Sequence, residues 1–304
     1  MDIMTSVSDR TFGLRRCGLM LALVIAILTA RAEDFVKNAA PAELEVRYER
    51  VEVLDTTRDG DDRKAFVDRT MLRMGGGMSL FCCIPRLMRD SLMAVNPALY
   101  WEMEKVQFEK DPKGFSSTEN TLQRIGAYNS YVYKNYPEGK VTEASYFDME
   151  RRLYEEDWEK PDWEITDETK EVIGYECFKA TTEYRGRTWT AWFAPEIPVQ
   201  DGPWKLCGLP GLILEAHDKN KDYQFTATSL FVNPDAQIGY FTYSDRRGVT
   251  KTSRDKYFNS WWKYTNSNFG EKMNSMYGKG PKPSEKRKTK PHHDKEETDY
   301  PHDL

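Results

Sequence analysis

The chain has 304 residues, and its 44 basic and 49 acidic side chains give a net charge of −5. Because the two signs are mixed along the sequence, there is no basic field to attract nucleic acid or anionic lipid, and nucleic acid is excluded as a partner. Aromatic residues form 13% of the chain, which is enough large apolar surface for a folded, water-soluble protein.

The N-terminus predicts export. Three arginines precede an apolar stretch at 18–28, and Ala30-Arg31-Ala32 then gives the small-x-small pattern of a cleavage site. The apolar stretch is shorter than the ~20 residues that a membrane-spanning helix needs. We therefore expect a cleavable signal peptide at 1–32 and a soluble, periplasmic or secreted mature protein without a transmembrane segment.

The first half of the mature chain has the two-residue period of half-buried strands. Strands are expected at 44–53, 66–74 and 78–82, with a hairpin turn at Gly75-Gly76-Gly77 and a short helix at 86–94. Asn96-Pro97 ends that helix, and residues 97–125 show no clear pattern.

The second half predicts three successive hairpins, which together imply one antiparallel meander. The strand pairs are 131–133 with the strand from 141, 173–181 with 187–193, and 212–216 with 223–227. A further strand is expected at 237–242. Residues 253–268 then change to a helical period, with Ser253 as N-cap and an aromatic stripe that includes Tyr257 and Trp261.

These elements predict a mainly β fold with minor α structure. The expected architecture is a curved antiparallel meander sheet with the aromatic helix packed on it, analogous in shape alone to the half-barrel of periplasmic lipoprotein carriers. We expect a single β-rich domain at 33–277. From residue 278 onward Pro, Lys and Glu dominate without apolar periodicity, which predicts a disordered charged tail at 278–304.

Four cysteines remain after signal removal, and they permit three pairings that the sequence does not distinguish. We favour a disulfide between Cys177 and Cys207. Adjacent cysteines such as Cys82 and Cys83 bridge each other poorly, and one of the two is expected to face the core. There is no CxxC motif or neighbouring histidine, so no metal site and no cofactor are expected.

Several blocks recur in an order and spacing that resemble the GLPGLI family. They are Gly174-Tyr175-Glu176-Cys177-Phe178-Lys179-Ala180, Arg185-Gly186-Arg187, Ala191-Trp192, Glu196-Ile197-Pro198, Gly202-Pro203-Trp204-Lys205 and the stretch from Gly208 to Leu214. The resemblance is closest at 125–230 and looser at 40–270. It implies an exported protein of Gram-negative bacteria from a family with many paralogues and no established activity.

The hexapeptide that names this family specifies a backbone path. It runs Gly208-Leu209-Pro210-Gly211-Leu212-Ile213. Proline fixes φ and glycine permits conformations that other residues avoid, while no side chain here transfers protons, binds metal or attacks a carbonyl. The motif is therefore interpreted as a structural element that positions its neighbours.

Catalytic candidates are few. His217 is the one histidine inside the predicted domain, and it lacks the partners of a nucleophilic triad. Glu196 and Asp201 are the carboxylates that a paired acid and base would use. Structural roles are favoured for both, with Asp201 in an Asx-turn before Gly202 and Glu196 paired with Arg187.

A binding role has more residues to support it. Aromatic side chains gather on adjoining predicted strands beside the Arg185-Gly186-Arg187 turn, and both faces of the strand 188–193 carry tryptophan. Ordinary core packing is the alternative for most of these aromatics. The proposed ligand-binding residues are Arg187, Trp192, Glu196 and Trp204, and the ligand class is an apolar molecule or a peptide with an anionic end.

The working hypothesis is a non-enzymatic periplasmic protein that binds a ligand or acts like a chaperone through an aromatic sheet face. A second hypothesis is a carboxylate-dependent hydrolase of the cell envelope. A third is an accessory subunit that docks on an outer-membrane protein complex.

Overall fold

The computed structural model describes residues 36–53, 65–112, 126–147, 150–232, 236–241, 249–266 and 295–300. Strands dominate these residues, and all but two of the strands belong to one large sheet.

Six consecutive strands form the first half of this sheet, each antiparallel to the next. They are β2 (Leu44–Val53), β3 (Ala65–Gly75), β4 (Met78–Cys83), β5 (Ser130–Lys134), β6 (Lys140–Phe147) and β7 (Glu150–Asp157). Between β3 and β4 the chain reverses at Gly76 and Gly77, which both have a positive φ that favours glycine. Sequence neighbours thereby become neighbours in the sheet.

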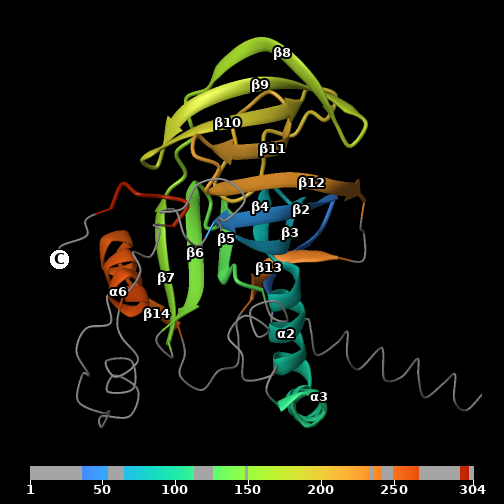
Figure 1. Ribbon diagram of the computed structural model, residues 1–304, viewed down its shortest axis with the longest axis vertical. Helices are drawn as coiled ribbons and strands as arrows, with labels where there is room; N and C mark the ends of the chain where they lie inside the picture. The colour runs from blue at the N-terminus through green and yellow to red at the C-terminus, as the bar shows by residue number, and fades with distance from the viewer. Residues whose placement is uncertain are drawn as a thin grey trace, which may run out of the picture.

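The second half is another antiparallel meander. It consists of β8 (Glu164–Val172), β9 (Tyr175–Tyr184), β10 (Arg187–Ala194), β11 (Leu212–Asp218) and β12 (Tyr223–Phe231). β12 pairs with β2 and joins the halves, while β14 (Val249–Lys251) adds to β7 in parallel. Figure 1 shows this sheet bending strongly between β8 and β7, and it stays open without closing into a barrel.

The inner face of the bent sheet encloses the main core. Trp189 belongs to this core, and its ring centroid lies 5.5 Å from that of Trp204 and 6.2 Å from that of Phe225. Phe81 continues the cluster at 5.8 Å from Phe225 and 6.3 Å from Tyr48. All five side chains are buried, so aromatic packing stabilises the bend by removing large apolar surfaces from water.

The outer face of β3 to β5 has a second core. It is covered by α2 (Ile84–Val95) and by a two-stranded ribbon of β1 (Val36–Pro41) and β13 (Gln237–Phe241). Alternation divides the adjacent cysteines, with Cys82 in this outer core and Cys83 in the inner one. α3 (Pro97–Lys110) follows α2, and α6 (Arg254–Asn266) packs against β7 beside the sheet (Figure 1).

The predicted fold class is confirmed: the chain is mostly β with few helices, and its large sheet is antiparallel except at β14. The expected hairpins and the short helix after β4 are present. α3 has no amphipathic pattern in the sequence because its apolar residues point in several directions, and Leu99, Trp101 and Met103 are all exposed. β7 and β8 were missed because charged residues fill both faces.

The predicted signal peptide at 1–32 lies outside the described residues. No helix within the described ranges combines the length and the apolar character needed to cross a membrane. The single domain at 33–277 stays a prediction.

The closest backbone packing in the hexapeptide is at Gly211, where an added Cβ would overlap Ala194 and approach Pro195 Cα to 2.9 Å. We expect Gly211→Ala to lower the free energy of unfolding by about 3 kcal/mol, because backbone atoms cannot move aside. Gly139→Ala is the matched control: no atom lies within 4 Å, and only the about 1 kcal/mol penalty of its positive φ should appear. Urea denaturation measures both, and equal losses would contradict this account.

Candidate binding site

Charged side chains enter the interior at one end of the inner face. On β6, Glu143 shares a face with the core residue Val141, and it is opposite Tyr154 on β7. Glu143 and Tyr154 are both buried. A carboxylate in such surroundings stays ionised only if cations and hydrogen-bond donors surround it.

Lys205 supplies the central cation. The loop 195–211 between β10 and β11 carries it into the interior, where the side chain is fully buried. Its Nζ lies 2.7 Å from Glu297, 2.9 Å from Glu156 and 3.4 Å from Glu143. It also donates a hydrogen bond of 2.6 Å to the Tyr154 hydroxyl. One ammonium group thus holds three carboxylates together.

These contacts move the pKa values of both partners away from neutrality. Burial alone would lower the pKa of Lys205, but the three carboxylates outweigh burial and raise it. Burial alone would raise the pKa of Glu143, but the ammonium groups of Lys295 and Lys205 hold it well below its ordinary value. Both side chains are therefore charged at neutral pH.

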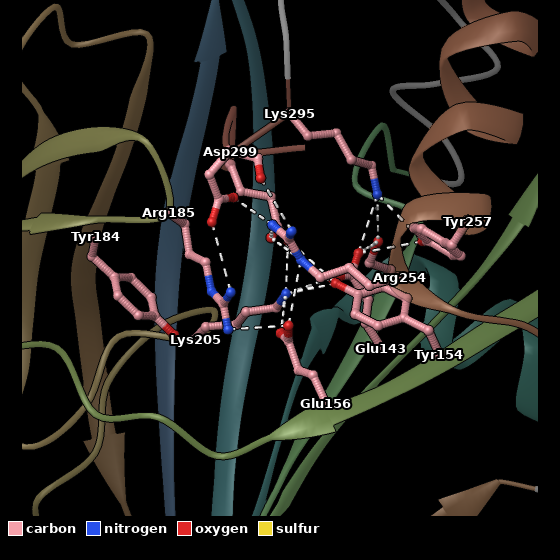
Figure 2. A network of polar contacts seen from close by, with 12 residues as sticks. Glu143, Tyr154, Glu156, Tyr184, Arg185, Lys205, Arg254, Tyr257, Lys295 and Asp299 are labelled. Atoms are coloured by element: carbon pink, nitrogen blue, oxygen red, sulfur yellow. Dashed lines mark hydrogen bonds and ion pairs between the residues drawn. The ribbon is translucent and has the colours of Figure 1, made fainter. Parts of the chain in front are cut away.

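Glu156 on β7 gathers three cations from separate segments. Its carboxylate lies 2.9 Å from Lys205, 3.0 Å from Arg185 and 3.4 Å from Arg254. Arg185 belongs to the turn between β9 and β10, and Arg254 begins α6. Figure 2 shows these side chains converging on Glu156 from different sides.

Residues 295–300, here called the C-terminal segment, lie over this network. These residues are part of the tail that was expected to be disordered. In the structure they are packed against the fold, because Lys295, Glu296, Glu297 and Tyr300 are all buried. The segment has no apolar period because it pairs charges with the sheet instead of burying an apolar stripe. The rest of 278–304 lies outside the described residues.

Each charged side chain at the start of the segment has a specific partner. Lys295 Nζ lies 3.1 Å from Glu143, and Glu296 lies 2.6 Å from Arg50 on β2. Glu297 accepts from Lys205 and is also paired with Arg254. The segment therefore contacts β2, β6, α6 and the loop 195–211 through side chains.

The turn between β9 and β10 binds the backbone of the segment. The Thr298 amide donates to the Arg185 carbonyl at 2.9 Å, and its hydroxyl donates to the Gly186 carbonyl at 3.0 Å. Arg187 Nη2 donates to the Lys295 carbonyl at 2.9 Å. All three residues of the Arg185-Gly186-Arg187 turn thus take part.

Helix α6 closes the site from the side. Tyr300 stacks on Phe258 with ring centroids 4.4 Å apart and an interplanar angle of 16°. The Tyr257 hydroxyl is 2.5 Å from Ser145 Oγ and 3.4 Å from Lys295 Nζ. The predicted helix and its aromatic stripe are confirmed, and Ser253 accepts from the Lys256 amide at 3.4 Å as an N-cap.

The chemistry of this arrangement favours binding over proton transfer. General acid and base catalysis needs a group whose pKa lies near the working pH. Burial raises the pKa of Tyr257 to about 12. The neighbouring charges raise the pKa values of Lys205 and Lys295 and lower the pKa of Glu143. In the described ranges, no cluster of His, Cys, Asp or Glu is suited to hold a metal ion.

The four predicted ligand-binding residues do not meet. Arg187 contacts the C-terminal segment and pairs with Asp218 at 3.1 Å, and Trp204 is buried in the inner core. Trp192 lies on the opposite face of β10 with Lys170 Nζ 4.4 Å from its ring centroid. Glu196 is exposed. Alternation of the strand separates Trp192 from Arg187, so a binding role for all four together stays an unsupported prediction.

The hexapeptide packs as a structural element. Gly208 has a φ of 92°, and Leu209, Leu212 and Ile213 are buried in the inner core. Pro210 is exposed between them. The hexapeptide therefore holds the end of the loop 195–211, a few residues after Lys205, in place.

The expected disulfide is absent: Cys177 and Cys207 are free thiols, as are the other two cysteines of the described chain. Cys177 lies on β9 with its thiol 3.6 Å from the Tyr175 carbonyl. Cys207 lies in the loop 195–211, where its carbonyl accepts from Trp163 at 2.8 Å. Burial raises the pKa of both thiols, which keeps them protonated.

Sequence reasoning missed most of the network. Lys205 stands in the quoted block Gly202-Pro203-Trp204-Lys205, and a lysine next to a core tryptophan was a usable signal. Glu143 alternates in phase with apolar residues of β6, which was another. The C-terminal segment gave none, because its partners are distant in sequence.

Part of this chain is similar to a known protein domain. A family model described as "N-glycanase peptide, N-terminal domain" (PNGase F-II) matches residues 112–238. Two solved structures of PNGF-II, in space groups P21 and C2, match with TM-scores of 0.44 and 0.45 at 15% identity. They cover 74% of this chain and 34% and 33% of the PNGF-II chains, so this chain spans about a third of their length. No curated protein matches.

These findings correct the family resemblance. The matching model is that of the N-glycanase domain, and the assignment to the GLPGLI family is wrong. The matched range contains Glu143, Glu156 and Lys205 but ends before α6 and the C-terminal segment.

We expect Lys205→Met to lower the free energy of unfolding by about 3–5 kcal/mol, because buried carboxylates would lose their shared cation. Lys251→Met is the control: it breaks the exposed pair with Glu155 and should change stability by less than about 1 kcal/mol. Urea denaturation of both variants measures the difference. A loss below about 1 kcal/mol for Lys205→Met would show that the buried pairing is not formed in solution.

The depressed pKa of Glu143 predicts acid sensitivity. Its pairing contributes stability that is present above the ordinary glutamate pKa of about 4.3 and is lost as pH falls through the lower folded value. Glu143→Gln should therefore be less stable than wild type at pH 7 and lose less stability below about pH 4. Parallel curves of unfolding free energy against pH for the two proteins would contradict this assignment.

Proposed function

We propose that this chain is an exported, non-enzymatic binding protein that holds a protein ligand at the polar end of the inner face. The observation that carries the proposal is how the C-terminal segment is held. Three of its charged side chains are buried in ion pairs with residues from separate elements, and its backbone is hydrogen-bonded to the turn between β9 and β10 and to Arg254 of α6. Such a site recognises a pattern of charges in a peptide.

The residues named for a carboxylate-dependent hydrolase have different surroundings. Glu196 is exposed, whereas Asp201 is paired with Lys134 and accepts from the Gly202 amide at 2.7 Å. An acid and base pair needs both carboxylates in one cleft with separated pKa values. These surroundings support structural roles and favour binding over hydrolysis.

The match to the N-terminal domain of an N-glycanase supports glycoproteins as the ligand class. The matching family model describes an N-terminal domain and not a whole enzyme, and the matched residues 112–238 include the strands that supply Glu143 and Glu156. We propose that the chain binds glycoproteins outside the cytoplasm, which it reaches through the signal peptide predicted at 1–32.

Binding of the full-length chain to an immobilised N-glycosylated protein tests this function. We expect saturable binding by surface plasmon resonance and no released glycan or peptide by mass spectrometry. Turnover that Glu196→Gln abolishes, with an unchanged circular dichroism spectrum, would contradict the proposal and favour the hydrolase. A stable assembly with an outer-membrane complex in native mass spectrometry would favour the accessory subunit.

A pair of charge variants locates the site. Arg185→Gln, at the turn that contacts the segment, should weaken glycoprotein binding about tenfold, which corresponds to about 1.4 kcal/mol. Lys251→Gln removes a cation outside the site and should leave the affinity unchanged. If both variants have the same effect, the binding site lies elsewhere.

A further inference from the structure

We infer that the C-terminal segment is a tethered, exchangeable ligand, and that the site takes acidic peptides with two adjacent carboxylates followed by an aromatic residue three positions after the second. This inference rests on the proposed binding function and names the ligand feature that the site would read. The pattern in this chain is Glu296-Glu297-Thr298-Asp299-Tyr300.

The cations that contact the C-terminal segment keep acidic partners when the segment is absent. Five cations contact the segment, and each also has an acidic partner in the rest of the fold. The pairs are Arg50 with Glu52 and Asp68, Arg185 with Glu156 and Glu159, Arg187 with Asp218 and Asp222, Lys205 with Glu143 and Glu156, and Arg254 with Glu156. Departure of the segment therefore leaves no buried cation alone, which is the arrangement expected of a ligand site.

The segment is held mainly by side chains. Among the described residues, one backbone-to-backbone hydrogen bond joins it to the fold, from the Thr298 amide to the Arg185 carbonyl. It belongs to no strand or helix. Release of the segment breaks no sheet ladder, so its exchange does not require the fold to open.

The surface beneath the segment has a notch at Gly186. An added Cβ there would overlap the Thr298 hydroxyl and lie 3.0 Å from the Asp299 amide nitrogen. The positive φ of Gly186 is common to other turns of this sheet, but its close approach to another segment is specific. At Gly174, in the preceding turn, no atom lies within 4 Å of the equivalent position.

The residues of the segment differ in how many contacts they make with the site, and this orders their expected importance in a ligand. Glu297 is the centre, because Lys205, Arg254 and the Tyr154 hydroxyl all contact its carboxylate. Glu296 adds the pair with Arg50, and the aromatic ring three residues after Glu297 stacks on α6. The Asp299 side chain is 36% exposed and lies at the rim, where a pair contributes less.

Covalent tethering sets the condition for exchange. A tethered ligand competes at an effective concentration on the order of millimolar, so a free peptide must exceed that concentration or bind at several points. The full-length chain is therefore tested with a synthetic peptide of residues 295–300 at about 10 mM. Hydrogen exchange of the Thr298 amide is the readout, because that amide is bonded in the docked state.

We expect the peptide to speed exchange at Thr298 at least tenfold, since it displaces the resident segment. The same peptide carrying Glu297→Gln should have no effect. Unchanged exchange with the wild-type peptide would overturn the inference and make the segment a fixed part of the core.

A matched pair of full-length glycine variants provides an independent arm. Gly186→Ala should remove protection of the Thr298 amide and abolish the response to peptide, whereas Gly174→Ala, which carries the same backbone penalty at an open position, should behave as wild type. Equal protection in the two variants would overturn the inference.

Glycoprotein binding in the same samples separates the two proposals. If the peptide leaves Thr298 exchange unchanged while the glycoprotein still binds, the inference of an exchangeable segment fails and the proposed function stands. If the peptide displaces the segment but no glycoprotein binds, the acidic-peptide site stands and the proposed glycoprotein function fails.

Discussion

The ammonium group of Lys205 among three carboxylates is the interaction on which the polar half of this structure depends. A buried ammonium group is tolerated only when negative charges and hydrogen-bond acceptors enclose it. This requirement brings β6, β7, the loop 195–211 and the C-terminal segment to one point, although they are distant in sequence. The network is therefore a constraint on assembly as well as a candidate recognition surface.

One loop connects the two halves of the interior. Trp204 enters the aromatic core beside Trp189, and the next residue enters the charge network. A positive φ of 52° at Trp204 allows consecutive side chains to take these two directions. The glycine and proline hexapeptide that follows holds the end of this loop against β10, so a motif without reactive side chains contributes to the site through position.

The sequence predicted the parts of the fold that depend on local pattern. Alternating apolar residues identified the hairpins, and the aromatic stripe identified α6. The pattern failed for β7 and β8, where charge covers both faces, and for α3, where apolar residues point all round the helix. The site was only partly predictable: Arg187 was named, but Glu143, Lys205 and the segment at 295–300 meet through long-range ion pairs that have no period in the sequence.

The central claim is that Lys205 and Glu297 are paired in solution, and a double-mutant cycle measures that pairing directly. Unfolding free energies are determined for wild type, Lys205→Met, Glu297→Gln and the double variant. The account predicts a coupling energy of about 2 kcal/mol, because each single change removes the same buried contact. Additive losses, with a coupling energy below about 0.5 kcal/mol, would contradict it.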